Sequence, residues 1–122
     1  MTRILVADDE KVIADSLVKI LAQAGYDASA AYSGEQAVET ALQLKPDFLL
    51  TDVIMGLMSG VVAGMIVRRS LPDCRVILFS GQANVAPLLK TAEENGHRFE
   101  LLAKPVAPDK LLDYLANNAR RL

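Results

Sequence analysis

The sequence contains a single cysteine, Cys74, so the chain cannot close an internal disulfide. A lone cysteine is compatible with a reducing compartment. The first residues run directly into an apolar segment and show no pattern of a secretory signal. We therefore expect a cytoplasmic protein.

No apolar run in the sequence is long enough to cross a bilayer. The longest uncharged stretch, residues 53–67, is shorter than the about 20 residues that a membrane helix needs. Gly56, Gly60 and Gly64 in this stretch have the spacing at which small residues pack membrane helices, which we interpret as coincidence in so short a run. We expect no contact with a membrane.

Charge of neither sign dominates the chain, because the net charge is −2 and the basic residues are scattered. A nucleic-acid-binding domain usually carries a basic patch, so we expect no direct contact with nucleic acid. The chain also lacks repeats and low-complexity segments. Its 122 residues, of which 52% are hydrophobic, are enough for one core, and we expect a single domain over residues 1–122.

Short apolar runs alternate with segments of helical periodicity along the whole chain. The apolar runs favour buried strands, and they are residues 2–7, 27–31, 48–52, 75–80 and 99–103. The periodic segments favour helices, and they are residues 11–24, 33–44, 59–70, 86–94 and 108–121. Five β-α units in succession imply an α/β fold with one parallel sheet and helices on both faces.

Polar side chains follow four of the five expected strands. Asp8 and Asp9 follow the first strand and Asp52 ends the third, while Ser80 ends the fourth and Lys104 follows the fifth. Parallel strands end at one edge of the sheet, where open α/β sheets bind their ligands. Neighbouring carboxylates repel one another unless a cation lies between them, and oxygen ligands suit a hard ion such as Mg²⁺.

Taken singly, each of these residues has a simpler explanation. Asp8 and Asp9 suit the start of a helix, where negative charge is favourable. Lys104 could form a salt bridge with one of the acids, and Ser80 could be a strand-end hydroxyl without a role. Taken together, they supply a metal site, a nucleophilic carboxylate, a hydroxyl donor and a cation, which is the set that phosphoryl transfer to an aspartate requires.

This ordered set of strand-end residues resembles the receiver domain of two-component response regulators, and the resemblance covers the whole chain. It implies a flavodoxin-like fold, which is a doubly wound (βα)5 three-layer sandwich with strand order 2-1-3-4-5. It further implies a phosphoacceptor rather than a classical enzyme. Asp52 would accept a phosphoryl group from a sensor histidine kinase or a phosphotransfer protein, and the domain would assist its own Mg²⁺-dependent phosphorylation and dephosphorylation.

The resemblance also implies a role for each site residue. Asp9 would bind Mg²⁺ directly and Asp8 mainly through water, and the Asp52 carboxylate and the Ile54 backbone carbonyl would complete the protein ligands. Ser80 would hydrogen-bond the phosphoryl group, and Lys104 would form an ion pair with it. By the same resemblance, the peptide bond between Lys104 and Pro105 is expected to be cis.

In this family the fourth helix, fifth strand and fifth helix form the face that changes on phosphorylation and meets partners. Here that face comprises residues 86–94, 99–103 and 108–121, in a protein that we expect to be a monomer or a weak homodimer. Leu101 occupies the position of the usual aromatic switch residue, and Phe99 has the same strand parity. Met55 is followed by Gly56, where the family often has proline.

Three other functions compete with this one, and the residues bear on each of them. The chain could be a receiver-fold interaction module that works without phosphorylation. A hydrolase of the haloacid dehalogenase type would need a second aspartate at position 54, which is Ile54. A flavin or nucleotide binder would need a glycine- or hydroxyl-rich loop after the first strand, where Asp8, Asp9 and Glu10 stand instead. The one histidine, His97, is expected to be a solvated loop residue.

Overall fold

The computed structural model describes residues 1–81 and 85–119. Strands and helices alternate along the chain, as the sequence pattern predicts. They are β1 (Arg3–Ala7), α1 (Lys11–Gln23), β2 (Asp27–Ala31), α2 (Gly34–Leu44), β3 (Phe48–Asp52), α3 (Gly60–Ser70), β4 (Arg75–Ser80), α4 (Ala86–Glu94), β5 (Glu100–Ala103) and α5 (Pro108–Ala119).

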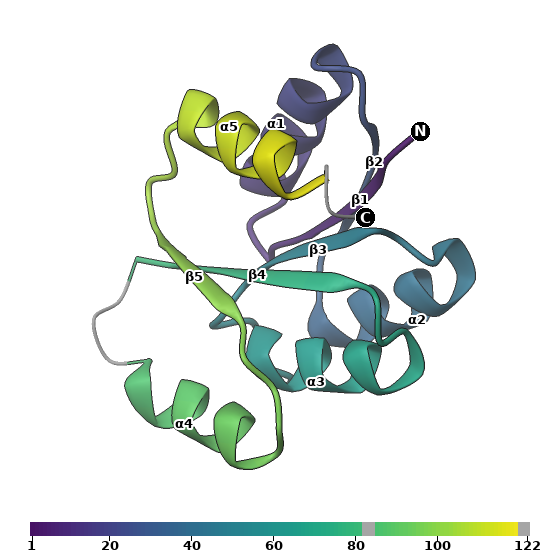
Figure 1. Ribbon diagram of the computed structural model, residues 1–122. Coiled ribbons are helices and arrows are strands. Elements are labelled where there is room, and N and C mark those ends of the chain that lie inside the picture. Colours follow the sequence, from purple (N-terminus) through teal and green to yellow (C-terminus); the bar gives the residue numbers. More distant parts are fainter. Residues whose placement is uncertain (82–84, 120–122) are drawn as a thin grey trace.

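The five strands form one sheet in the order β2-β1-β3-β4-β5, and every neighbouring pair is parallel. Helices α1 and α5 cover one face of the sheet, and α2, α3 and α4 cover the other (Figure 1). This arrangement is the flavodoxin-like three-layer sandwich, so the predicted fold and strand order are confirmed. None of the described helices is both long enough and apolar enough to cross a membrane.

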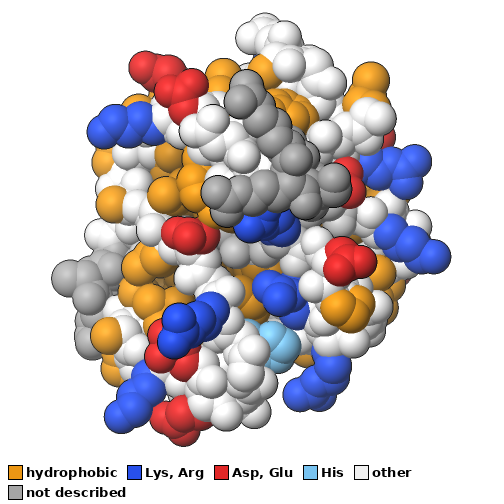
Figure 2. Space-filling view, viewed as in Figure 1, with side chains coloured by type: hydrophobic (Ala, Val, Ile, Leu, Met, Phe, Trp, Pro, Cys, Tyr) orange, Lys and Arg blue, Asp and Glu red, His pale blue; other side chains and the backbone are white. Residues whose placement is uncertain are grey.

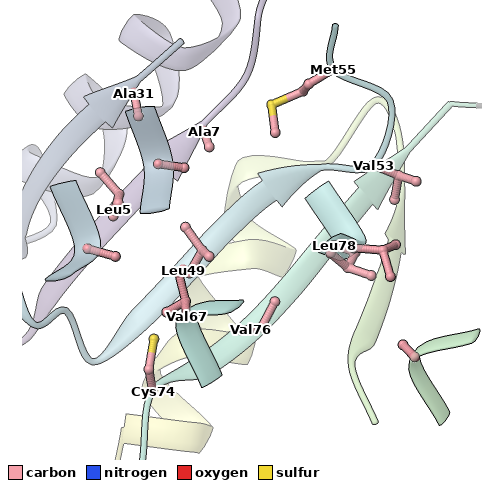
Figure 3. Close-up of a cluster of buried hydrophobic side chains, with 14 of the residues drawn as sticks. Leu5, Ala7, Ala31, Leu49, Val53, Met55, Val67, Cys74, Val76 and Leu78 are labelled. Atoms are coloured by element: carbon pink, nitrogen blue, oxygen red, sulfur yellow. The ribbon is translucent and has the colours of Figure 1, made fainter. Parts of the chain in front are cut away.

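Each face of the sheet has its own hydrophobic core, because alternate residues of a strand point to opposite faces. In β1, Leu5 packs with the α2–α4 side and Val6 with the α1 and α5 side. Strand β3 is buried along its first four residues, which is the pattern of a central strand. Figure 3 shows the α2–α4 side, where Met55 from the loop after β3 points into the same cluster as Ala7.

Helix α3 lies close to the sheet because two of its residues are glycine. A Cβ atom at Gly60 would overlap the backbone carbonyl of Asp52, and a Cβ atom at Gly64 would lie 2.9 Å from Val76 Cγ1. Residues four apart share one face of a helix, so both glycines meet the sheet together. For Gly60 and Gly64 the spacing therefore serves tight helix–sheet packing, whereas Gly56 lies before α3 and a Cβ atom there would meet nothing within 4 Å.

The predicted boundaries agree with the structure to within one or two residues. Ser33 caps α2 by accepting a hydrogen bond from Gln36 N at 3.0 Å, while Gln36 Oε1 accepts one from Tyr32 N at 2.7 Å, one residue before the expected partner of a capping box. Strand β5 begins at Glu100. The expected end of α5 at Arg121 lies outside the described residues.

His97 is not the solvated residue that we expected from its polar surroundings. It is half-buried, and its ring stacks on Phe99 with centroids 5.7 Å apart and an interplanar angle of 22°. Phe99 is itself packed against the core on the α2–α4 side. The partly buried Phe99 ring therefore gives His97 an apolar surface to lie on.

Candidate functional site

The carboxyl ends of the strands bring the predicted polar residues together. One carboxylate oxygen from each of Asp8, Asp9 and Asp52 lies within 4.8 Å of the others, a spacing that could hold a metal ion. Lys104 reaches the same place from the end of β5. Because the order of strands places β1 beside β3 and β5 beyond β4, residues far apart in sequence meet at one edge.

Asp8 is buried, and both of its carboxylate oxygens have partners. Oδ1 accepts a hydrogen bond from Glu10 N at 2.9 Å, and Oδ2 accepts one from Lys104 Nζ at 2.8 Å. Its backbone N–H donates to Ala31 O at 3.1 Å, which fixes the chain as it leaves β1. Asp9, in contrast, is exposed. Asp8 is therefore held rigidly, and Asp9 is the acid open to solvent.

Lys104 bridges two of the acids. Its Nζ lies 3.4 Å from Asp52 Oδ2 in addition to its contact with Asp8, and its side chain is 19% exposed. Its backbone N–H donates to Ser80 O at 2.9 Å, so the pairing of β5 with β4 continues up to the lysine. The peptide bond to Pro105 is cis, as predicted. Burial disfavours the ammonium, but the hydrogen bond from Lys104 to Asp8 and the charge of Asp52 outweigh burial and raise the lysine pKa.

The pKa of Asp52 is raised above its usual value. Burial is the largest cause, the charge of Lys104 opposes it, and the negative charge of Asp8 adds to it. The folded protein therefore holds Asp52 in an environment that disfavours its negative charge. Such strain is typical of functional carboxylates.

Removing this charge is expected to stabilise the metal-free protein. Because the folded pKa of Asp52 lies above the unfolded one, the free energy of unfolding falls as pH rises through the window between the two values. Asp52→Asn in chelator at neutral pH should therefore melt at a higher temperature than wild type, and the gain should shrink as pH falls toward the usual carboxyl range. Asp9→Asn should act in the same direction, because it also removes one of the crowded like charges.

Thermal melts in chelator across a pH series measure this effect. Asp73→Asn is the matched control, since Asp73 is exposed and forms no ion pair with any described residue. With saturating Mg²⁺ the gain should shrink or reverse. Lower melting temperatures for both site variants in chelator would contradict the proposed charge crowding.

Two residues to which the sequence assigned no role in the site, Thr51 and Gly60, support it. Thr51 is fully buried, and its hydroxyl donates to the backbone carbonyl of Asp52 at 3.0 Å. Gly60, the first residue of α3, donates its N–H to Val53 O at 2.8 Å. A hydroxyl inside an apolar strand was the available signal for Thr51. The signal for Gly60 was its place at a helix start, which does not by itself distinguish a packing role.

A second hollow of the described structure lies at the opposite end of the sheet. It has a volume of about 1110 Å³ and lies where β4 begins, with His97, Phe99 and Tyr114 among its lining residues. Figure 2 shows the histidine on this side of the molecule, with a basic side chain close to it. Charges of both signs line this hollow and none of them forms a metal-sized cluster, so the carboxylate edge is the candidate site.

The fold and this site define a class of protein, namely flavodoxin-like α/β domains with an acidic site at the carboxyl ends of the strands. A family model described as the response regulator receiver domain matches residues 4–116. The chain belongs to this family. Its members are the receiver domains of two-component response regulators, in which phosphorylation on aspartate and Mg²⁺ are typical, and the Asp cluster fits both. They are phosphoacceptors rather than classical enzymes.

Individual relatives and solved structures agree with this family membership. The chain is 29% identical over 114 residues to the chemotaxis protein CheY of Thermotoga maritima, covering 93% of both proteins. It is 34% identical over 113 residues to a response regulator receiver protein of Anaeromyxobacter, covering 93% of this chain and 47% of that protein. The solved structure of the response regulator TrrA from Thermotoga maritima, in complex with Mg²⁺-BeF, superimposes with a TM-score of 0.82 at 26% identity and covers 96% of this chain and 98% of that one.

The chain spans about half the length of several of the curated relatives it matches. Family membership sets aside the hydrolase and the flavin-binding alternatives.

Proposed function

We propose that Asp52 is the residue that accepts the phosphoryl group. One observation carries this assignment: of the two acids that contact Lys104, only Asp52 keeps a carboxylate oxygen without a hydrogen bond to any described residue. Both oxygens of Asp8 have partners. A nucleophile needs a lone pair directed away from its own protein, and Asp52 Oδ1 supplies one beside a cation.

The reaction forms a bond between an Asp52 oxygen and phosphorus and breaks the phosphorus–nitrogen bond of a phosphohistidine donor. The Lys104 ammonium lies next to Asp52 and would form an ion pair with the transferred group. The hydroxyl of Ser80, at the end of the neighbouring strand, would donate to another phosphoryl oxygen. Each of these groups is held by a strand end, so little reorganisation is needed during transfer.

The carboxylates fit a divalent metal, because oxygen ligands within 4.8 Å of one another suit a hard cation. We propose that Asp9, Asp52 and the Ile54 carbonyl bind Mg²⁺ directly and that Asp8 acts through water, since both oxygens of Asp8 are occupied. When bound, the ion offsets negative charge on the phosphoryl oxygens. The exposed position of Asp9 leaves its carboxylate free to approach the ion.

Receiver domains interact with histidine kinases and downstream effectors. For this chain we propose that residues 1–122 form one receiver domain that meets a sensor histidine kinase or phosphotransfer protein in the cytoplasm. The downstream partner, or an output domain, would bind the face formed by α4, β5 and α5. We expect a monomer or a weak homodimer.

Phosphoryl transfer to the wild-type protein tests the proposal. The chain is incubated with acetyl phosphate or phosphoramidate in millimolar Mg²⁺ and in excess chelator, and intact mass is measured. A gain of one phosphoryl group only in Mg²⁺ is expected. An unmodified protein in Mg²⁺ with both donors would favour the second candidate, an interaction module that works without phosphorylation.

Leu101 is the observation that favours this second candidate, because it stands where the family has an aromatic switch. It lies in β5 opposite Leu78 and is 39% exposed, so its side chain is already partly in solvent. A leucine has no ring to move between exposed and buried positions, so the two states of this face should differ little. A small difference in free energy gives a small shift in population.

We therefore expect phosphorylation to change this face modestly, and Leu101→Tyr to enlarge the response. The wild-type change should come from the backbone of the loop at 80–85, of which residues 82–84 lie outside the described residues. Amide chemical shifts recorded before and after addition of Mg²⁺ and beryllofluoride measure the response. Leu57→Tyr is the control, because Leu57 is 99% exposed and lies outside this face. Large wild-type shifts across the face that Leu101→Tyr does not increase would contradict the expectation.

A further inference from the structure

We infer that Thr51 and Gly60 are positioning residues for the metal site, a role that rests on the proposed function and specifies how the chain prepares it. Together they hold the backbone carbonyls of Asp52 and Val53. As a result the Asp52 carboxylate and the Ile54 carbonyl are fixed in place before a cation arrives.

The Thr51 hydroxyl is directed at the end of β3 and the loop that follows it, where the proposed ligands Asp52 and Ile54 lie. Thr51 is fully buried in a strand that is otherwise apolar up to Asp52, and a buried hydroxyl is costly unless it is hydrogen-bonded. Its Oγ1 donates to the Asp52 carbonyl at 3.0 Å and contacts Met55 Sδ at 3.9 Å. Both contacts are with the segment that carries the proposed ligands.

Gly60 packs directly against the backbone carbonyl of Asp52. A Cβ atom there would overlap the Asp52 carbonyl and would lie 2.8 Å from Thr51 Oγ1, so only glycine leaves room for both. The Gly60 N–H donates to Val53 O at 2.8 Å, and Val53 N in turn donates to Phe79 O at 3.0 Å. The start of α3 is thereby hydrogen-bonded to the residue after β3, with the Asp52 carbonyl packed against Gly60.

Ile54 is the first loop residue whose carbonyl accepts no hydrogen bond from the described residues. Its neighbours Val53 and Met55 are buried in the core (Figure 3). Ile54 itself is 45% exposed. The two buried side chains hold the backbone on either side of it. Groups that orient metal ligands in this manner typically change metal affinity about 10- to 100-fold when they are removed.

Mg²⁺ titrations of the full chain test this inference. Thr51→Val keeps the shape of the side chain and removes the hydroxyl, so we expect the Kd for Mg²⁺, measured by isothermal titration calorimetry, to rise about tenfold. Thr51→Ser keeps the hydroxyl and should bind within about twofold of wild type. Thr91→Val is the matched control, because the Thr91 hydroxyl also donates to a backbone carbonyl, that of Pro87 at 3.1 Å, in exposed α4. Its Kd should equal that of wild type.

A wild-type Kd in Thr51→Val, with only a lower melting temperature, would overturn the inference and leave Thr51 a purely structural residue. Equal losses in Thr51→Ser and Thr51→Val would also overturn it. Should Thr51→Val not fold, Thr51→Ala gives the same comparison without the hydroxyl. A wild-type protein that binds no Mg²⁺ would instead overturn the proposed function, so the two failures are distinguishable.

Discussion

Asp52→Asn is expected to abolish phosphoryl uptake from a small phosphodonor in Mg²⁺. The amide lacks the negative charge that makes the carboxylate a nucleophile. Asp8 cannot replace it, because its oxygens are held by Glu10 N and Lys104 Nζ. Intact mass spectrometry of wild type and variant under identical conditions measures the difference, and the variant should stay at its unmodified mass.

Asp73→Asn is the control for this experiment, since Asp73 is exposed and lies just before β4, at the end of the sheet opposite the site. It should accept one phosphoryl group as wild type does. A phosphorylated species that persists in Asp52→Asn would show that another residue is the acceptor.

Mg²⁺ is expected to raise the thermal stability of the wild-type protein strongly. An ion that binds only the folded state adds about 2.7 kcal/mol to the free energy of unfolding at a hundredfold excess over its Kd. For a domain of this size that corresponds to a rise in melting temperature on the order of 10 °C. The physical cause is relief of the repulsion among Asp8, Asp9 and Asp52, whose oxygens lie within 4.8 Å.

Melting curves at increasing Mg²⁺, with ionic strength held constant by NaCl, separate ion binding from simple screening. The combined Asp9→Asn and Asp52→Asn variant should lose most of the shift, because it removes two of the three carboxylates. A wild-type melting temperature that Mg²⁺ leaves unchanged would argue against a metal site at this edge.

The layout of the site could be predicted from the sequence because it depends on topology. Once alternating strands and helices imply a parallel sheet, Asp52 and Lys104 must reach the same edge, although 51 residues separate them. One local signal was equally direct, because Ser33 stands three residues before Gln36 at a helix start, which is the pattern of an N-cap, and Ser33 caps α2. The cis bond after Lys104 was expected from the family resemblance. Topology and capping depend on residue type and local order, which a sequence displays.

The supporting contacts could not be predicted, because they depend on distances between elements. Whether a glycine in α3 marks a weak helix or a close approach is decided by the separation of α3 from the sheet. In the structure, Gly60 leaves room for the Asp52 carbonyl and Gly64 for Val76. The stacking of His97 on Phe99 likewise depends on where the chain enters β5. The polar residues around His97 had predicted a side chain in solvent.

Strand β5 limits how a partner could approach the face formed by α4, β5 and α5, which we propose for partner binding. It is one of the two edge strands of the sheet, it has only four residues, and it begins with the exposed charge of Glu100. Short, charged edges resist pairing with strands of other molecules. A partner therefore has few unpaired backbone groups with which to add a strand to the sheet. We expect it to recognise side chains of α4 and α5 instead. The same brevity disfavours edge-to-edge aggregation at the surface that we propose for partner binding.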